Sequence, residues 1–113
     1  MRSKIVALSK NDDFKELLKM KKVFNKYVTI FFGHLNNKDN RKLNISFVTK
    51  KKLGNAVKRN KVKRRLRNIM NDITKKVSVE LNYSYLVIAK STMLSNEFNN
   101  IKETLLKEFK KIK

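Results

Sequence analysis

Apolar residues recur along the chain with spacings that change from helical to extended and back. In the first such segment, Phe14, Leu17 and Leu18 are spaced as on one face of a helix. Asn11 is a suitable N-cap, because its side-chain oxygen can accept a hydrogen bond from a backbone N–H of the first turn. The pattern therefore predicts a helix over residues 11–20.

Two runs rich in β-branched and aromatic residues follow, over residues 27–35 and 43–49, and each is typical of a strand. Residues 36–40 between them are polar and favour a turn. We therefore expect the two runs to pair as a hairpin. Residues 4–8 are a candidate for one further short strand.

A long helix is predicted over residues 55–79, where apolar side chains recur every three or four positions. Its apolar stripe consists of Val62, Leu66, Ile69, Ile73 and Val77. An apolar run over residues 83–89 predicts a strand in the centre of the sheet. A final helix has Ser95 as its candidate cap. The apolar stripe of that helix consists of Phe98, Ile101, Leu105, Phe109 and Ile112.

This order of elements, α-β-β-α-β-α with one candidate extra strand, favours an α+β fold. A strand, a long helix and another strand in succession indicate a βαβ unit with parallel strands, so the sheet should be mixed. The pattern does not give the handedness of this crossover, for which the general preference is right-handed. All 113 residues are expected to form a single domain, because smaller pieces could not bury a good core.

The chain contains no cysteine, which excludes disulfides, thiolate catalysis and cysteine-based metal sites and fits a reducing compartment. No apolar run reaches the roughly 18 residues of a membrane span. Residues 1–10 lack the cleavage pattern of a signal peptide. We therefore expect a cytoplasmic protein without a membrane partner.

Charge is the most informative feature of the composition, because the chain has 29 Lys and Arg residues against 9 Asp and Glu, a formal net charge of +20. Residues 50–67 contain no acidic residue. Their basic residues are Lys50, Lys51, Lys52, Lys58, Arg59, Lys61, Lys63, Arg64, Arg65 and Arg67. A lysine-rich composition alone would account for diffuse charge. The clustering instead favours a polyanionic partner, and nucleic acid above all.

Within this basic segment, Arg59, Lys63 and Arg67 share one helical stripe, and Asn60 and Arg64 form the neighbouring one. The apolar stripe of the same helix must face the core, so both basic stripes should face solvent. Arg can bind phosphate oxygens there in a bidentate manner, and Asn can bind a base edge or a 2′-hydroxyl. The alternative is a charge-rich helix face that is only solvated, although such faces normally mix both signs.

The sequence offers weaker evidence for a base-stacking surface or a catalytic site. Aromatic residues such as Phe14, Tyr27 and Phe47 could stack unpaired bases if they were exposed, but at strand or helix spacing such residues usually belong to a core. His34 is the only histidine, and there is no Gly-rich phosphate loop. We expect no catalytic residues in this chain.

Residues 51–67 read KKLGNAVKRNKVKRRLR. This segment closely resembles the signature of the bacterial ribonuclease P protein subunit, K-K-x-G-N-A-V-x-R-N-x-x-K-R-x-x-R, at every fixed position. The resemblance extends to the start of the first helix at residues 11–14 and to the apolar strand at residues 85–89.

The resemblance implies an α-β-β-β-α-β-α fold: a mixed four-stranded sheet packed by helices, with a left-handed βαβ crossover, similar to the second domain of ribosomal protein S5. It also implies the role of protein subunit in a ribonucleoprotein endoribonuclease. In that enzyme the catalytic RNA removes the 5′ leader from precursor tRNA with bound Mg²⁺, and the protein binds both this RNA and the leader. Mg²⁺ would be held mainly by the RNA and not tightly by the protein alone. No obligate protein partner is implied.

Two binding surfaces follow from the resemblance. The surface for the catalytic RNA comprises Lys51, Lys52, Asn55, Arg59, Asn60, Lys63, Arg64 and Arg67. The leader would bind in a cleft between the first helix and the sheet, lined by Phe14, Leu18, Lys19, Tyr27, Val28, Ile30 and Val48. At Leu18, Ile30 and Val48 the family often has an aromatic residue, a tyrosine and a small polar residue, so this cleft should be more aliphatic than usual.

Two other classes of protein compete with this interpretation. A ribosomal or other structural RNA-binding protein would account for the charge and size but not for the signature. A stand-alone nuclease would need a cluster of carboxylates or histidines, which the sequence does not offer.

Overall fold

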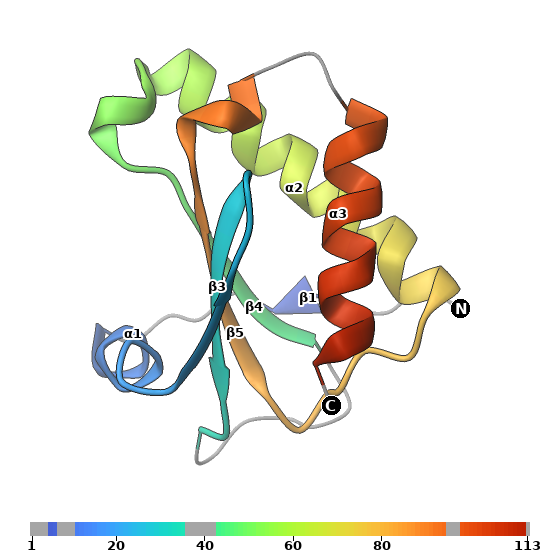
Figure 1. Ribbon diagram of the computed structural model, residues 1–113. Helices are drawn as coiled ribbons and strands as arrows, with labels where there is room; N and C mark the ends of the chain where they lie inside the picture. The colour runs from blue at the N-terminus through green and yellow to red at the C-terminus, as the bar shows by residue number, and fades with distance from the viewer. Residues whose placement is uncertain (1–4, 7–10, 36–42, 95–97, 113) are drawn as a thin grey trace.

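The computed structural model of the chain describes residues 5–6, 11–35, 43–94 and 98–112. In chain order its elements are β1 (Ile5–Val6), α1 (Asn11–Leu17), β2 (Lys21–Phe24), β3 (Val28–Gly33), β4 (Leu43–Val48), the 3₁₀-helix η1 (Lys51–Leu53), α2 (Ala56–Lys76), β5 (Ser84–Ala89), the 3₁₀-helix η2 (Ser91–Leu94) and α3 (Phe98–Lys111) (Figure 1). From α1 onward the α-helices and strands follow the expected α-β-β-β-α-β-α order. The short β1 falls within the candidate strand at residues 4–8.

The strands form one mixed sheet in the order β1-β4-β5-β3-β2. β5 lies in the centre as predicted, parallel to β4 and antiparallel to β3. The expected α+β fold with four main strands is therefore present, and the two-residue β1 adds a fifth strand at one edge. α2 connects the parallel neighbours β4 and β5, which confirms the βαβ unit. The left-handed sense of this crossover stays a prediction.

The predicted hairpin between the two runs that flank residues 36–40 is wrong, because β5 lies between β3 and β4 and the hairpin partner of β3 is β2. Asn25 shapes the β2–β3 turn: its side-chain oxygen accepts hydrogen bonds from the backbone N–H groups of Tyr27 at 2.8 Å and Val28 at 3.0 Å. β2 was missed because only Val23 of its residues is partly buried. Such a strand shows no apolar alternation.

Element boundaries differ slightly from those predicted. α1 ends at Leu17 rather than at residue 20, and α2 covers Ala56–Lys76 inside the predicted 55–79. The predicted cap Ser95 lies outside the described residues. The apolar stripes of the two long helices face the core as expected: Val62, Leu66, Ile69, Ile73, Ile101, Leu105, Phe109 and Ile112 are buried, and Val77 and Phe98 are partly buried.

Helices cover both faces of the sheet (Figure 1). α2 and α3 lie on one face and enclose the main hydrophobic core with the strands. α1 lies on the other face, which we call the α1 face, where Leu17 and Leu86 form a smaller buried cluster. Because α1 has only 7 residues, it covers only part of this face.

Polar contacts link separate segments of the fold at two places. Lys102 Nζ in α3 lies 2.9 Å from Asp72 Oδ2 in α2. The hydrogen bond and charge of Lys102 lower the pKa of Asp72, and the same hydrogen bond raises the pKa of Lys102. In β5, burial raises the pKa of Tyr85, whose hydroxyl donates to the backbone carbonyl of Glu80 at 2.6 Å.

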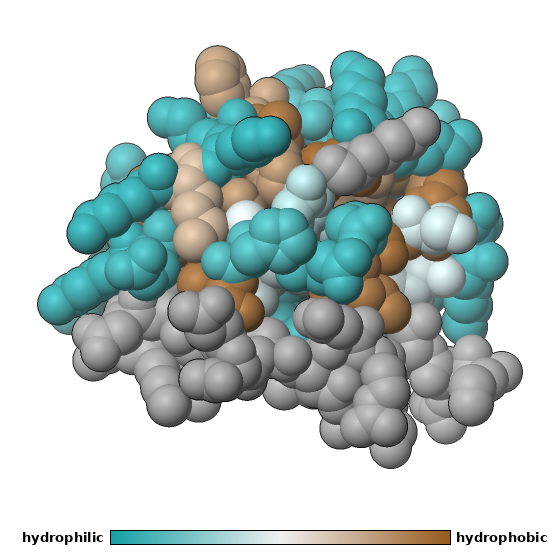
Figure 2. All heavy atoms as spheres, turned by 90° about the horizontal axis from the view of Figure 1, so that it is seen from below, coloured by the Kyte–Doolittle hydropathy of each residue, from teal (hydrophilic) through white to brown (hydrophobic). Residues whose placement is uncertain are grey.

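The outer surface reflects the charge of the sequence. On the face seen in Figure 2, hydrophilic side chains lie along the left, upper and right margins, and hydrophobic ones show in small patches between them. In the described part of the chain, every helix is too short or too polar to cross a membrane.

Candidate nucleic-acid interface

The basic segment forms the loop before α2 and the first half of that helix. Asn55 caps the helix, because its side-chain oxygen accepts a hydrogen bond from the backbone N–H of Lys58 at 3.0 Å. Gly54 has a φ of 149°, which L side chains rarely adopt, and a Cβ there would lie 2.8 Å from Lys58 Cδ. The Gly-Asn pair of the signature therefore sets where α2 begins. Asn55 was predicted to bind RNA, but its side-chain oxygen is already used as the helix cap.

The basic stripes of α2 face solvent as predicted. The exposed members of the predicted RNA surface are Lys51, Lys52, Asn55, Asn60, Lys63, Arg64 and Arg67. Arg59 is only partly exposed, and its Nε is buried without a hydrogen-bond partner among the described residues. Arg65 is half-buried and donates from Nη1 to the backbone carbonyl of Met93 at 3.1 Å, so it ties α2 to η2.

The basic surface of α2 meets the α1 face of the sheet in a cavity of about 510 Å³ beside β4, which we call the α2 pocket. Lys63 and Arg67 from α2 line it together with Phe14 from α1 and Val48 from β4. The other lining residues are Ile45, Ser46, Phe47 and Asn71. The surfaces predicted separately for the catalytic RNA and for the leader are therefore continuous at this pocket.

Three residues predicted to line the leader cleft lie on the opposite side of the sheet. Tyr27, Val28 and Ile30 are 3%, 0% and 0% exposed and belong to the main core. Because side chains alternate along a strand, β3 presents Thr29 and Phe31 to the α1 face instead. Along β3, the cleft residues assigned from the resemblance are therefore off by one position. The alternation of side chains with a period of two, which can be read from the sequence, could have corrected this assignment.

The remaining cleft residues stay accessible on the α1 face or beside it. Phe14 and Val48 are partly buried and meet in the α2 pocket. Leu18 and Lys19 are exposed directly after the end of α1, and Leu18 is 49% exposed. Of the predicted cleft, the structure therefore brings Phe14 and Val48 together and leaves Leu18 and Lys19 on the neighbouring surface.

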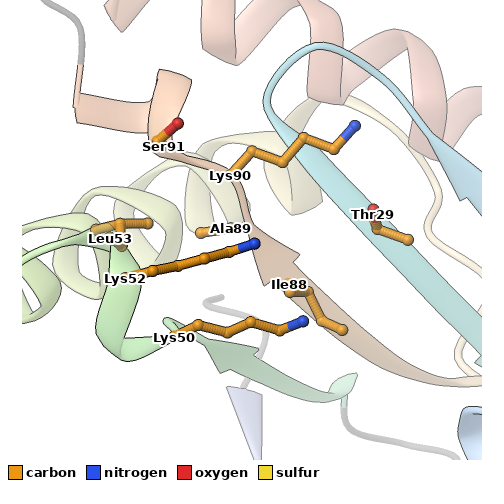
Figure 3. A pocket seen from close by; sticks show the side chains of 8 residues that line it. All are labelled: Thr29, Lys50, Lys52, Leu53, Ile88, Ala89, Lys90 and Ser91. Carbon is orange, nitrogen blue, oxygen red and sulfur yellow. The ribbon is translucent and has the colours of Figure 1, made fainter.

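A second cavity, of about 550 Å³, opens where β5 ends and is called the lysine cavity below (Figure 3). Lys50 and Lys52 line it from the segment before α2, and Lys90 from the residue after β5. The other lining residues are Thr29, Leu53, Ile88, Ala89 and Ser91, so none is acidic. Lys90 could not be singled out from the sequence, because a single lysine after a strand is ordinary and only the fold brings it close to the basic segment.

Comparison with known proteins supplies the family. The family profile described as Ribonuclease P matches residues 3–113, almost the whole chain. The chain belongs to the ribonuclease P protein family. The ribonuclease P protein component of Mesoplasma florum is 32% identical over 100 residues, 88% of each chain. That of Mycoplasma mycoides subsp. mycoides is 30% identical over 107 residues, 95% of each chain.

Solved ribonuclease P proteins share the fold. The protein from Thermotoga maritima matches with a TM-score of 0.79 at 27% identity, covering 96% of this chain and 98% of that one. The Staphylococcus aureus protein matches with a TM-score of 0.72 at 30% identity, covering 94% and 93%. These matches agree with the α+β architecture that the resemblance implied.

As a member of the ribonuclease P protein family, the chain is part of a ribonucleoprotein endoribonuclease.

The residues of the signature have different places in the structure: Gly54 and Asn55 shape the start of α2, whereas Arg64 and Arg67 project into solvent. Across the described residues, His, Asp and Glu form no group of three or more that could hold a metal ion. His34 packs edge-on against the ring of Tyr83 at a centroid distance of 4.9 Å.

Proposed function

We propose that this ribonuclease P protein binds the catalytic RNA and the 5′ leader of precursor tRNA in the cytoplasm. In that complex it assists Mg²⁺-dependent endonucleolytic removal of the leader, which gives the mature tRNA 5′ end. The observation that carries the proposal is the α2 pocket, where exposed basic residues of α2 line the same hollow as Phe14 and Val48. A phosphate-binding surface therefore adjoins a hollow suited to unpaired nucleotides.

The solvent-facing surface of α2 has the chemistry that structured RNA requires. Arg64 and Arg67 are exposed on a regular helix, so their guanidinium groups can bind phosphate oxygens in a defined geometry. Asn60 can both donate to and accept from a 2′-hydroxyl or a base edge. Because the surrounding segment lacks acidic residues, the attraction to RNA phosphates is not offset locally.

The α1 face suits the leader. Phe14, Phe31 and Val48 belong to the partly buried apolar residues around the cluster beneath α1. Lys22 Nζ lies 5.9 Å from the centroid of the Phe31 ring, and Lys63 lines the α2 pocket. Unpaired bases can pack against such apolar side chains while the lysines neutralise the phosphates.

The cleavage chemistry is proposed to belong to the RNA. Mg²⁺ takes hard oxygen ligands such as carboxylates and phosphates. Residues 50–67 contain no carboxylate, so this basic segment offers no such ligand to a Mg²⁺ ion, whereas RNA phosphates do. The contribution of the protein is positive charge and shape: it holds the leader and the catalytic RNA side by side.

Binding and cleavage measured with the protein alone, the catalytic RNA alone and both together test this proposal. We expect no cleavage of precursor tRNA by the protein alone, and tighter binding of precursor than of mature tRNA by the complex. A structural RNA-binding protein would bind the RNAs without that preference and without an effect on cleavage. A stand-alone nuclease would cut precursor tRNA as RNA-free, highly purified protein.

A further inference from the structure

A third group of basic residues lies on the flank of α2 that faces η2. Lys58, Lys61 and Arg65 occupy positions that the family signature leaves open, and none of them belongs to the RNA surface predicted from the resemblance. Successive residues of an α-helix are about 100° apart, so Arg65 lies about 160° around the helix from Lys63. The buried stripe that contains Val62 separates the two. α2 therefore presents basic side chains on both sides of the stripe that faces the core.

These three side chains line a cavity of about 240 Å³ between α2 and η2, which we call the η2 cavity. The other lining residues are Val62, Met93 and Leu94, so none is acidic. Lys58 and Lys61 are exposed and Arg65 is half-buried, whereas Val62 and Met93 are buried. The η2 cavity therefore has cations at its mouth and an apolar inner wall.

Hydrogen bonds hold the wall that η2 contributes to this cavity. Arg65 Nη1 donates to the backbone carbonyl of Met93 at 3.1 Å, and the backbone N–H of Met93 donates to the carbonyl of Lys90 at 3.0 Å. Thr92 Oγ1 donates to the backbone carbonyl of Lys26 at 2.5 Å, which ties η2 to the β2–β3 turn. A ligand therefore meets an arginine and a backbone segment that are already fixed, so less conformational entropy is lost on binding.

The size and charge of the η2 cavity indicate what it can bind. Its volume is below the roughly 300–1,000 Å³ of cavities that enclose a drug-sized ligand, so it has room for one unit of a chain rather than for a whole small molecule. Three cations without a carboxylate favour a phosphate, and the apolar wall favours a base or a ribose beside it. One nucleotide supplies both parts.

The surroundings of the cavity favour RNA over another polyanion. Lys61 and Arg64 are both exposed and stand three positions apart, so they are neighbours on the surface of α2. A strand of the catalytic RNA that binds Arg64 therefore reaches the mouth of the cavity. An acidic peptide would match the charge of the cavity but not this continuity with the proposed RNA surface.

We infer that the η2 cavity binds one unpaired nucleotide of the catalytic RNA, with its phosphate among Lys58, Lys61 and Arg65 and its base or ribose against Leu94. This inference rests on the proposed function and adds a contact at positions that the family signature leaves open. Because the α2 pocket lies on the other flank of the helix, α2 is then inserted between two segments of RNA.

Substitutions at the mouth and at the wall of the cavity test this site by equilibrium binding to the catalytic RNA. Lys61→Ala should weaken binding about 3- to 10-fold and reduce the slope of log affinity against log salt concentration by about 0.7–0.9, and Lys61→Glu should weaken binding further. Leu94→Ala leaves the charge unchanged, so it should weaken binding about 2- to 5-fold without altering the slope. Lys110→Glu in α3 is the matched control for charge reversal. A thermal melt of each variant gives the temperature below which all are folded and can be compared.

Crosslinking identifies the RNA segment on each flank of α2. The chain has no cysteine, so Lys61→Cys and Lys63→Cys each provide a single thiol for a photoreactive group. In the protein–RNA complex the two labels should react with different segments of the catalytic RNA, and the label at position 61 should react with an unpaired nucleotide. If both labels react with the same nucleotides, α2 is not inserted between two segments and the inference is wrong.

The inference and the proposed function fail in different ways. If the natural protein does not bind the catalytic RNA, the proposed function itself is wrong. If it binds and Lys61→Glu behaves like Lys110→Glu, only the η2 site is overturned. Unchanged affinity in Leu94→Ala would show that a phosphate alone is bound and would overturn the nucleotide assignment.

Two probes distinguish the catalytic RNA from other sources of negative charge. AMP stands for a free nucleotide and poly-glutamate for an acidic peptide, and the Tm of the protein reports the binding of each. We expect neither to bind through Lys61. If either probe raises the Tm of the natural protein but not that of Lys61→Glu, while both proteins bind the catalytic RNA equally, the cavity serves that other ligand and the inference is overturned.

Discussion

Arg64 and Arg67 offer a sharp test of whether α2 binds RNA as proposed, because both are exposed but only Arg67 lines the α2 pocket. Replacing either by alanine removes one guanidinium from a solvent-facing stripe and introduces a strong helix former. The free energy of unfolding should therefore change by less than about 1 kcal/mol. Any large loss of RNA binding then reflects the interface and not the fold.

The expected size of the binding loss follows from the contact that each guanidinium can make. A bidentate arginine–phosphate contact contributes about 1–3 kcal/mol, which is about 5- to 150-fold in Kd for the catalytic RNA. Arg64→Ala should weaken the complex equally whether mature or precursor tRNA is present. Arg67→Ala should show the same loss and should also reduce the preference for precursor tRNA, because its side chain borders the pocket that holds Phe14.

The assay is equilibrium binding of each variant to the catalytic RNA, followed by binding of precursor and mature tRNA to each complex, with a thermal melt alongside. Lys110→Ala is a matched control, because it removes one exposed charge from the last turn of α3. If Arg64→Ala and Arg67→Ala behave like Lys110→Ala, the basic stripes of α2 are only solvated. If either variant melts far below the natural protein, its side chain supports the fold and our reasoning about exposure is wrong.

Three further outcomes are expected. If about six basic residues contact phosphates, log affinity for the catalytic RNA should fall linearly with log salt concentration with a slope of about −4 to −5, and a slope near zero would contradict a charge-driven interface. Phe14→Ala should destabilise the fold by about 1–3 kcal/mol, less than the same substitution of a fully buried Phe. It should lower affinity for precursor tRNA but not for the catalytic RNA. Thermal melts and binding to both RNAs measure these effects. Because Lys102 lowers the pKa of Asp72, this carboxylate stabilises the fold above its unfolded pKa of about 3.9, and that contribution is lost as pH falls through the lower folded value. The small difference in Tm between the natural protein and Asp72→Asn should therefore be present at neutral pH and close as the pH falls through the lowered folded pKa of Asp72, and a difference that persists in strong acid would refute the assigned cause.

The parts of the fold that could be predicted are those where one side of an element is strongly apolar. The stripe from Val62 to Ile73 made α2 recognisable, and its orientation then placed Arg64 and Arg67 in solvent. The apolar composition of β5 on both faces likewise indicated a central strand. In these elements burial is decided locally, so a short window of sequence contains the information.

The parts that could not be predicted depend on contacts between distant segments. β2 has little buried surface of its own and exists because it pairs with β3 across the Asn25 turn. The hairpin error followed from the missing strand, since the next apolar run was taken as the partner of β3. Lys90 joins Lys50 and Lys52 only because parallel pairing brings the ends of β4 and β5 together. For Val28 and Ile30, the resemblance suggested a cleft, but alternation along β3 buries both.

This protein is proposed to assist an RNA catalyst, and the rate of precursor tRNA cleavage by a bacterial ribonuclease P RNA at low Mg²⁺, measured with and without the protein, tests that claim. We predict slow cleavage by the RNA alone and a clear rise in rate when the protein is added. The physical reason is that a chain with a net charge of +20 replaces part of the neutralisation that Mg²⁺ otherwise supplies. An unchanged rate with folded protein, or cleavage by the protein without RNA, would contradict the claim.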